Sequence, residues 1–251
     1  MVASDDLYIR AYNYNTQERV AMFEAHGDFI RYLEPHPTLP FLISCSDDMT
    51  ARLWDFSKRW KLVRTFEGHG HYVMMARVNP KDTNTFATAS LDGAIKVWSL
   101  NADEANYTLA GHTSGVNAID YYPGGDKPYL ISGSDDHTIK IWDYQTRSQV
   151  TTITGHSDNV SAVRFHPRLP IFISGSEDGN VRICHSATYK VVHQIDYSMD
   201  RCWSVDAALG SNKVAIGYDQ GFVVIKLGSE MPTTSLDQRT GKLVLAEGNT
   251  I

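Results

Sequence analysis

Residues 111–154, with the sequence GHTSGVNAIDYYPGGDKPYLISGSDDHTIKIWDYQTRSQVTTIT, decide the fold. Gly111-His112 opens this stretch, and Pro123-Gly124-Gly125 and Asp135-Asp136 stand where tight turns are expected. Four short runs of β-branched or alternating apolar residues lie around these turns, and Ile139-Lys140-Ile141-Trp142 is the clearest of them. The pattern predicts a four-stranded antiparallel sheet. Because a lone sheet of this size leaves both faces uncovered, the pattern also predicts neighbouring sheets.

The signatures of this stretch recur along the chain. Gly68-His69, Gly111-His112 and Gly155-His156 lie 43 and 44 residues apart, and Ala25-His26 lies 43 residues before the first of them. An aspartate precedes an aromatic or apolar position by six residues in six places: Asp6 and Tyr12, Asp48 and Trp54, Asp92 and Trp98, Asp136 and Trp142, Asp178 and Cys184, Asp219 and Ile225. A period of about 40–45 residues with these signatures is typical of WD-repeat β-propellers. The sequence therefore predicts an all-β fold of this kind.

The repeats predict an incomplete ring. Five are recognisable, at residues 25–67, 68–110, 111–154, 155–195 and, more weakly, 203–225, and most of another occupies residues 1–24. If the ring has seven blades, at least one whole blade is missing. We expect either an open or distorted ring or a piece of a longer protein. The predicted domains are a propeller over residues 1–229, with a partial first blade, and a tail or linker over residues 230–251 that leads towards a second domain.

Composition narrows the classes of function. The chain of 251 residues is 42% hydrophobic, enough for a substantial core, and its net charge of −6 argues against a general nucleic-acid or anionic-membrane binder. Cys45, Cys184 and Cys202 form no CxxC pair and are expected to be buried free thiols in a reducing compartment. The sequence has neither a membrane-spanning apolar run nor a signal-peptide pattern, which predicts a cytoplasmic protein. Phosphate-loop, dinucleotide and metal-ligand motifs are absent from it, so no cofactor or metal is expected.

A histidine, a hydroxyl residue and an aspartate recur in each full repeat and allow two interpretations. The four sets are His26, Ser44 and Asp48; His69, Thr88 and Asp92; His112, Ser132 and Asp136; and His156, Ser174 and Asp178. They resemble a nucleophilic triad, but an enzyme needs one activated nucleophile and would not repeat it in every blade. The favoured interpretation is a structural hydrogen-bond network that includes Trp54, Trp98 and Trp142. The chain is therefore predicted not to be an enzyme.

Two loop positions that repeat at the predicted mouth of the ring are mostly acidic. The first, two residues after the histidine, holds Asp28, His71, Ser114 and Asp158; the second, just before the structural aspartate, holds Asp5, Asp47, Leu91, Asp135 and Glu177. Six of these nine residues are acidic, and Phe29 and Tyr72 stand beside two of them. These acids are either solvated turn residues or an anionic rim that attracts peptides bearing lysine or arginine.

Several longer phrases resemble the amino-terminal propeller of the coatomer beta-prime family. They include Phe23-Glu24-Ala25-His26, His36-Pro37-Thr38, Asn79-Pro80-Lys81-Asp82, Asp120-Tyr121-Tyr122-Pro123 and Lys140-Ile141-Trp142-Asp143-Tyr144-Gln145-Thr146. The resemblance runs from residue 1 to about residue 228, and the tail is similar to the entry into the second propeller of that family.

The resemblance implies a subunit of the COPI vesicle coat, at work in Golgi-to-endoplasmic-reticulum and intra-Golgi transport. It implies as partners the other coatomer subunits and the cytosolic dilysine tails of membrane cargo, with no nucleic acid and only indirect membrane contact. The protein would then be cytoplasmic and peripheral on Golgi membranes and COPI-coated vesicles. A WD-repeat adaptor in another complex is the alternative.

The resemblance also assigns a cargo site. The acids that receive a cargo lysine match Asp28 and Asp47, and Tyr72 matches an aromatic residue beside them. The basic residues that hold the peptide carboxylate in that family lie mostly in a blade and a half that this sequence does not include, so no residue is assigned to that contact.

Overall fold

The structure is a computed structural model that describes residues 1–125, 127–228, 233–236 and 243–246. Among its described residues every element of regular secondary structure is a strand, apart from one 3₁₀ helix, η1 (Phe56–Lys58), so the prediction of an all-β fold is confirmed. The four full repeats each form one four-stranded antiparallel sheet with its strands in chain order. They are β4 (Ile30–Pro35), β5 (Phe41–Ser46), β6 (Ala51–Asp55) and β7 (Lys61–Phe66); β8 (Val73–Val78), β9 (Thr85–Ser90), β10 (Ala94–Ser99) and β11 (Ala105–Ala110); β12 (Val116–Tyr121), β13 (Tyr129–Ser134), β14 (Ile139–Asp143) and β15 (Ser148–Ile153); and β16 (Val160–Phe165), β17 (Ile171–Ser176), β18 (Asn180–His185) and β19 (Val191–Asp196).

Three-stranded sheets flank these four. β1 (Val2–Ala3), β2 (Tyr8–Tyr12) and β3 (Arg19–Glu24) form the first, and β20 (Cys202–Ala207), β21 (Lys213–Tyr218) and β22 (Gly221–Lys226) form the last. A separate pair, β23 (Thr233–Leu236) and β24 (Leu243–Ala246), lies within the predicted tail, and the expected domain boundary at residues 229–230 lies outside the described residues.

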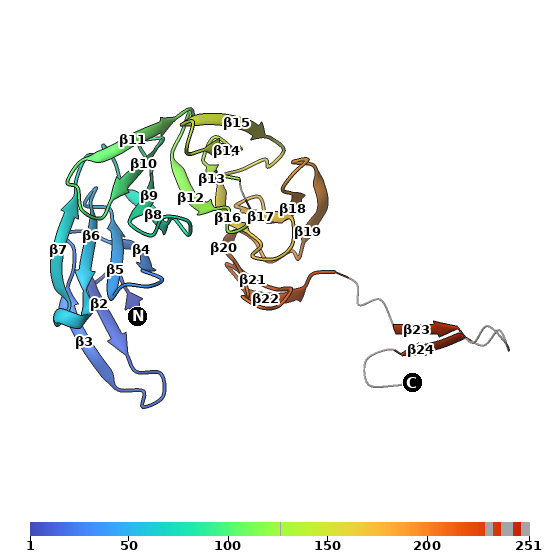
Figure 1. Ribbon diagram of the computed structural model, residues 1–251, viewed down its shortest axis with the longest axis horizontal. Coiled ribbons are helices and arrows are strands. Elements are labelled where there is room, and N and C mark those ends of the chain that lie inside the picture. Colours follow the sequence, from blue (N-terminus) through green and yellow to red (C-terminus); the bar gives the residue numbers. More distant parts are fainter. Residues whose placement is uncertain (126, 229–232, 237–242, 247–251) are drawn as a thin grey trace.

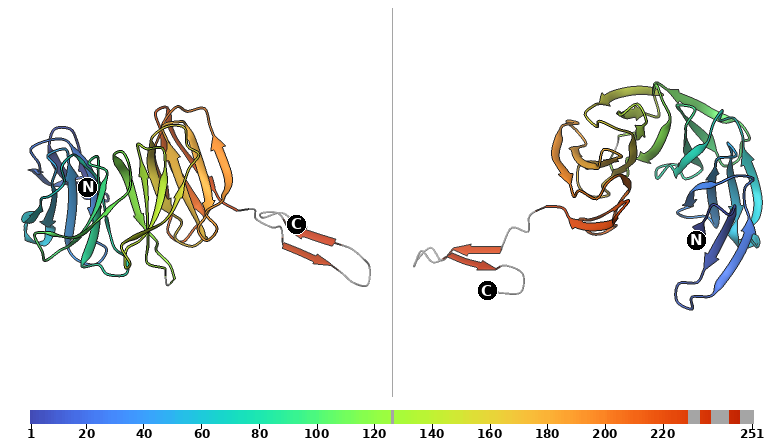
Figure 2. Two further views of the ribbon diagram at one scale, coloured as in Figure 1. Left: turned by 90° about the horizontal axis from the view of Figure 1, so that it is seen from above. Right: turned by 180° about the vertical axis from the view of Figure 1, so that it is seen from behind.

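The sheets follow one another around an open arc (Figure 1). The strands β4, β8, β12, β16 and β20 lie on its inner side and contact one another in that order, whereas β7, β11, β15 and β19 form its circumference. The sheets β1–β3 and β20–β22 are the two ends of the arc, and the view from behind shows the same opening (Figure 2). The described residues therefore adopt the open propeller that the sequence predicts.

Each sheet packs face to face against the next sheet, and a small residue lies at the contact between them. The fifth residue of the second strand is Cys45, Ala89, Gly133 or Gly175 in the four full sheets. A Cβ atom on Gly133 would lie 2.6 Å from Val160 Cγ1 and 3.0 Å from Val163 Cγ1, both of which belong to the following sheet. Buried clusters accordingly span successive sheets, and one of them joins Ile131 to Val160 and Val163. We call this small position the interface socket.

A row of alternating charges also joins the sheets. The fifth residue of each inner strand is, in order, Glu34, Arg77, Asp120, Arg164 and Asp206. Arg77 lies 3.0 Å from Glu34 and 3.7 Å from Asp120, and Arg164 lies 3.0 Å from Asp120 and 2.9 Å from Asp206. Burial raises the pKa of Asp120 and of Glu34, although the neighbouring guanidinium groups oppose this shift. We call this row the inter-sheet charge ladder.

Candidate functional site

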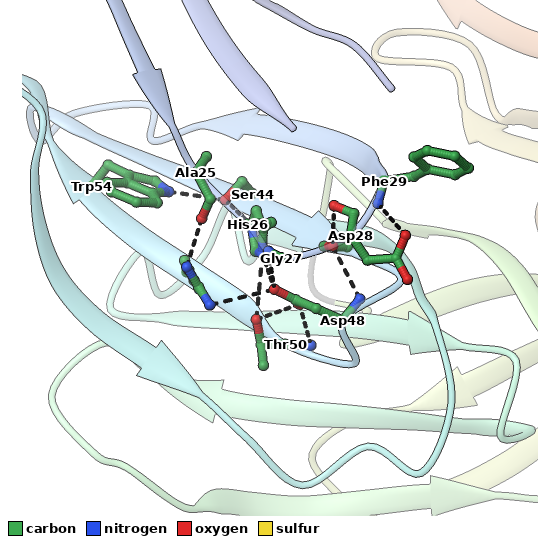
Figure 3. Close-up of polar contacts among 11 residues, drawn as sticks. Ala25, His26, Gly27, Asp28, Phe29, Ser44, Asp48, Thr50 and Trp54 are labelled. Carbon is green, nitrogen blue, oxygen red and sulfur yellow. Dashed lines mark hydrogen bonds and ion pairs between the residues drawn. The ribbon is translucent and has the colours of Figure 1, made fainter. Parts of the chain in front are cut away.

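The four repeated polar sets are hydrogen-bonded networks, as Figure 3 shows for the first of them. His26 Nδ1 lies 2.8 Å from Asp48 Oδ2, His26 Nε2 lies 2.6 Å from Ser44 Oγ, and Trp54 Nε1 donates to the same Oγ at 2.9 Å. Since the serine oxygen accepts the indole N–H, its own proton is free to bond His26 Nε2, which leaves Nδ1–H to donate to the aspartate. The order of the groups is that of a nucleophilic triad.

The other three sets repeat this geometry. His69 lies 2.8 Å from Asp92 and 2.7 Å from Thr88. His112 lies 2.8 Å from Asp136 and 2.7 Å from Ser132. His156 lies 3.0 Å from Asp178 and 2.9 Å from Ser174. Trp98 and Trp142 also donate to their hydroxyl groups, each at 2.8 Å, whereas Cys184 replaces the tryptophan in the fourth set.

Burial decides between the two interpretations of these sets. Ser44, Thr88, Ser132 and Ser174 are each 0% exposed, so no substrate can reach their hydroxyl oxygens. The aspartates instead join separate loops: Asp136 accepts the backbone N–H of Thr113 at 3.1 Å and that of Thr138 at 3.0 Å. Burial alone would raise the pKa of Asp136, but hydrogen bonds from Thr138 and His112 outweigh it and lower the pKa to about 2. The sets therefore act as structural connectors between loops.

The predicted cargo residues lie at one rim of the arc, between the sheets β4–β7 and β8–β11. Asp28 is half-buried, its Oδ1 accepts the N–H of Phe29 at 2.8 Å, and the Phe29 ring is 44% exposed. Figure 3 shows Asp28 and Phe29 beside the network of His26, to which the Ser46 hydroxyl connects Asp28: it donates to the Asp28 carbonyl at 3.0 Å and accepts the N–H of Asp48 at 3.1 Å. The Asp47 N–H donates to the Phe29 carbonyl at 2.9 Å, so the structure brings the loops of Asp28 and Asp47 together.

Asp47 forms an ion pair with Arg31, a residue to which the sequence assigned no role. Arg31 donates from Nε to Asp47 Oδ1 at 2.6 Å and from a second nitrogen to Oδ2, and Asp47 is only 4% exposed. The Arg31 guanidinium also lies 6.0 Å from the centre of the Tyr72 ring, which links the third predicted cargo residue to the same group. Its hydrogen bond to Asp47 raises the pKa of Arg31, so Arg31 stays charged. Asp28, Asp47 and Arg31 together keep one net negative charge.

The repeat pattern of the sequence contains evidence for the pairing of Arg31 with Asp47. Asn117 occupies the position of Arg31 in its own inner strand, and its side-chain amide donates to Asp135 at 2.6 Å, which is the equivalent of the contact with Asp47. Asp158 repeats the local geometry of Asp28, because it accepts the N–H of the following residue, Asn159, at 2.8 Å. Aligning the second residue of each inner strand with the rim acids would have predicted the donors to Asp47 and Asp135, whereas Glu177 accepts at 3.0 Å from Asn159, which precedes its inner strand.

The last sheet holds its aspartate differently. Asp219 accepts from Arg201 Nε at 3.0 Å and from Trp203 Nε1 at 2.6 Å, in place of a histidine. Arg201 also lies 3.8 Å from Glu177 of the preceding sheet. The inner strands surround a cavity of about 740 Å³, and Arg31, Asp135, Glu177 and Trp203 contribute to its lining.

Metal binding and thiol reactivity have little support in the part of the chain that the structure describes. No three histidine, cysteine, aspartate or glutamate side chains there are arranged to hold a metal. Cys45, Cys184 and Cys202 are buried free thiols, as predicted, and burial raises the pKa of Cys184 to about 11 and that of Cys202 to about 12. Within the same residues, no helical segment has the length and hydrophobicity that crossing a bilayer requires.

Comparison with known proteins first defines the class. The family described as "WD domain, G-beta repeat" matches residues 17–55, 60–99, 104–143 and 147–185, which together make up more than half of the chain. The chain belongs to this family. Each matched repeat begins near the outer strand of one sheet and ends with the third strand of the next, so it links two sheets covalently.

The chain is also similar in sequence to individual proteins. The chain is 61% identical to coatomer subunit beta′ of Rattus norvegicus over 194 residues, which are 77% of this chain and 21% of the relative. It is 57% identical to coatomer subunit beta′ of Drosophila melanogaster over 192 residues, 76% of this chain and 21% of the relative. It is 49% identical to the probable coatomer subunit beta′ of Schizosaccharomyces pombe over 192 residues, 76% of this chain and 24% of the relative. The similarity predicted from the longer phrases is confirmed, and the match spans between a fifth and a quarter of these relatives.

The structural account of the repeated sets makes a prediction about stability. Replacing Asp136 with alanine leaves His112 Nδ1–H and two backbone N–H groups without their acceptor, which should cost about 1–3 kcal/mol of unfolding free energy. In a chain of this size that loss lowers Tm by about 2–4 °C per kcal/mol. Calorimetry of Asp136→Ala measures it. The control is Asp158→Ala, which loses only a local contact; equal Tm values for the two variants would contradict the structural role.

Proposed function

We propose that this chain is a non-catalytic scaffold segment of the COPI vesicle coat that binds dilysine-type basic cargo tails in Golgi-to-endoplasmic-reticulum and intra-Golgi transport. The observation that carries the proposal is the 61% identity to coatomer subunit beta′ over 77% of the chain. The proposal places the protein in the cytoplasm, peripheral on Golgi membranes and COPI-coated vesicles, with the other coatomer subunits as partners. Membrane contact is then indirect.

Cargo binding rests on Asp28, Asp47 and Tyr72, with Arg31 added from the geometry. Because Arg31 already bonds both oxygens of Asp47, Asp28 is the carboxylate best placed to bond a lysine ammonium directly. Asp47 then acts through Arg31, which it holds near the face of Tyr72. The methylene stem of the lysine packs on Tyr72 or on the exposed ring of Phe29. This assignment modifies the simpler expectation that Asp28 and Asp47 share one ammonium equally.

The charges imply weak and salt-dependent binding. The rim keeps one net negative charge from Asp28, Asp47 and Arg31, and exposed ion pairs contribute about 0–1 kcal/mol each. Added salt screens such pairs over a Debye length of about 8 Å at physiological ionic strength. Affinity would therefore be micromolar at best, in the range of about −8 kcal/mol.

Affinity purification tests the coat assignment. The tagged chain should recover other coatomer subunits from a cell lysate, and mass spectrometry identifies them. A tagged chain with Asp136→Ala serves as the control for non-specific recovery, because its fold is weakened while its rim is unchanged. Recovery of a different complex without coatomer subunits would favour the alternative, a WD-repeat adaptor elsewhere.

Peptide titration tests the cargo site separately. A peptide that ends in a dilysine motif should bind the wild-type chain more tightly than a matched peptide with serine in place of both lysines. Asp28→Lys should weaken binding of the lysine peptide by about tenfold, because attraction becomes repulsion at the direct contact. Asp158→Lys carries the same substitution in the same local geometry on another sheet and should leave the affinity nearly unchanged. Equal losses in the two variants, or equal binding of the two peptides, would remove the assignment.

A further inference from the structure

The turn that joins β6 to β7 differs from its counterparts in the other sheets. It consists of η1 (Phe56–Lys58) followed by Arg59 and Trp60, with the sequence FSKRW. The turns of the same length between β10 and β11 and between β18 and β19 read LNADE (residues 100–104) and SATYK (residues 186–190). Of these three turns, only FSKRW combines two aromatic rings with two cations.

The backbone of this turn is strained. Arg59 and Trp60 both adopt the left-handed conformation, with φ of 57° and 60°, which is unfavourable for a residue with a bulky side chain. Asp55 fixes the turn, because its buried carboxylate accepts the backbone N–H of Ser57 at 2.9 Å and that of Lys58 at 3.2 Å. Strained backbone that its surroundings hold in place is concentrated at functional sites. The turn is therefore a candidate binding element.

The turn and the strand after it expose apolar side chains. The Trp60 ring is half-buried, with its centre 5.6 Å from that of Phe56 and 5.7 Å from that of Phe23 in the neighbouring sheet β1–β3. Phe56 is 39% exposed, and Leu62 and Val63 at the start of β7 are 39% and 47% exposed. We call Phe56, Trp60, Leu62 and Val63 the β7 edge patch.

Two cations flank the β7 edge patch. Arg59 and Lys61 are exposed, and neither forms an ion pair with any residue that the structure describes. Arg64, further along β7, is instead paired with Asp103 of the next sheet. Unpaired cations beside an apolar patch are complementary to a ligand that has both carboxylates and an apolar side chain. The patch is thus basic, although the whole chain has a net charge of −6.

The backbone of β7 is also available for hydrogen bonding. Among the described strands β7 pairs only with β6, and it lies on the circumference of the arc (Figure 1). Every second residue of an edge strand directs its N–H and C=O away from the sheet, where an extended peptide can add a further strand. Charged residues can also protect an edge from such pairing. The exposed side chains of Leu62 and Val63 argue against a purely protective role.

We propose that β7 and the turn before it form a docking surface for an extended acidic segment of another protein. The segment adds to the sheet as a strand beside β7. Its carboxylates pair with Arg59 and Lys61, and an apolar side chain between them packs on Phe56 and Trp60. Because successive connections in an antiparallel sheet alternate between its two ends, this turn lies at the end opposite the β5–β6 loop that holds Asp47. The proposal therefore does not depend on the proposed function.

An anionic membrane fits this surface less well. Aromatic and basic side chains also favour the interface of such a membrane. However, the turn of residues 100–104 presents Asp103 and Glu104 at the same end of the neighbouring sheet, and Asp103 lies against Arg64 of β7. A broad anionic surface would meet these acids, whereas a single extended segment reaches the two unpaired cations without them. The charges therefore favour an acidic peptide.

Fluorescence anisotropy of a labelled peptide tests the proposal on the full chain. The probe is EVEWEVE, which alternates glutamate with apolar residues, and the matched peptide ESESESE has the same charge without the apolar residues. The test variant, Arg59→Glu with Lys61→Glu, changes two exposed side chains, and circular dichroism checks its fold. The control variant, Arg147→Glu with Lys190→Glu, reverses one exposed cation in each of the corresponding turns of the sheets β12–β15 and β16–β19, so it changes the net charge equally.

The wild-type chain and the control variant should bind EVEWEVE roughly tenfold more tightly than the test variant does, and ESESESE should bind the wild-type chain about tenfold more weakly than EVEWEVE does. Amide hydrogen exchange should slow in β7 when EVEWEVE binds and should stay unchanged in β11, β15 and β19. No measurable binding of EVEWEVE, equal binding to the test variant, or no added protection in β7 would overturn the proposal.

Vesicles of phosphatidylcholine and phosphatidylserine provide the check against a membrane. Neither the wild-type chain nor the test variant should float with them. If the wild-type chain floats and the test variant does not, the surface binds a membrane, and that result would also overturn the proposal.

Discussion

The structure depends on one constraint: each sheet has two apolar faces, and in the four sheets between the ends of the arc neighbouring sheets cover both of them. A four-stranded sheet of about 45 residues cannot bury enough apolar surface alone. The central strands show this most clearly, since all but the first residue of β13 and of β17 are buried. The small residue at the interface socket lets two sheets approach closely, as Gly133 does beneath Val160 and Val163. Because each repeat as the family defines it, such as residues 104–143, contributes strands to two sheets, the chain itself also connects neighbouring sheets.

This constraint separates residues that hold the arc together from residues whose identity can vary between sheets. The repeated histidine, hydroxyl and aspartate groups connect loops within each sheet, and the zero exposure of Ser132 removes it from chemistry despite its triad-like partners. The residues at the rim, in contrast, vary from repeat to repeat. Arg31 and Asp47 form an ion pair where Met74 and Leu91, in the next sheet, are both apolar. The same scaffold thus presents a different surface at each sheet.

The sequence predicted the features that recur in every repeat. It did not predict the contacts that join two side chains far apart in the chain. Strands, turns and the polar sets follow from spacing, because the same local chemistry recurs about every 43 residues. The Arg31–Asp47 pair and the charge ladder were not predicted, since each joins residues whose proximity depends on the folded sheets.

Hydrogen exchange of a single interface variant tests the dependence of one sheet on the next most directly. Gly133→Val adds a side chain whose Cβ would lie 2.6 Å from Val160 Cγ1, so the strain arises between two sheets. The account predicts faster amide exchange in β16–β19 as well as in β12–β15, measured by mass spectrometry of peptic fragments, with little change in β4–β7. Faster exchange confined to β12–β15, with wild-type protection across residues 160–196, would show that the sheets are stable without their neighbours and would contradict the account.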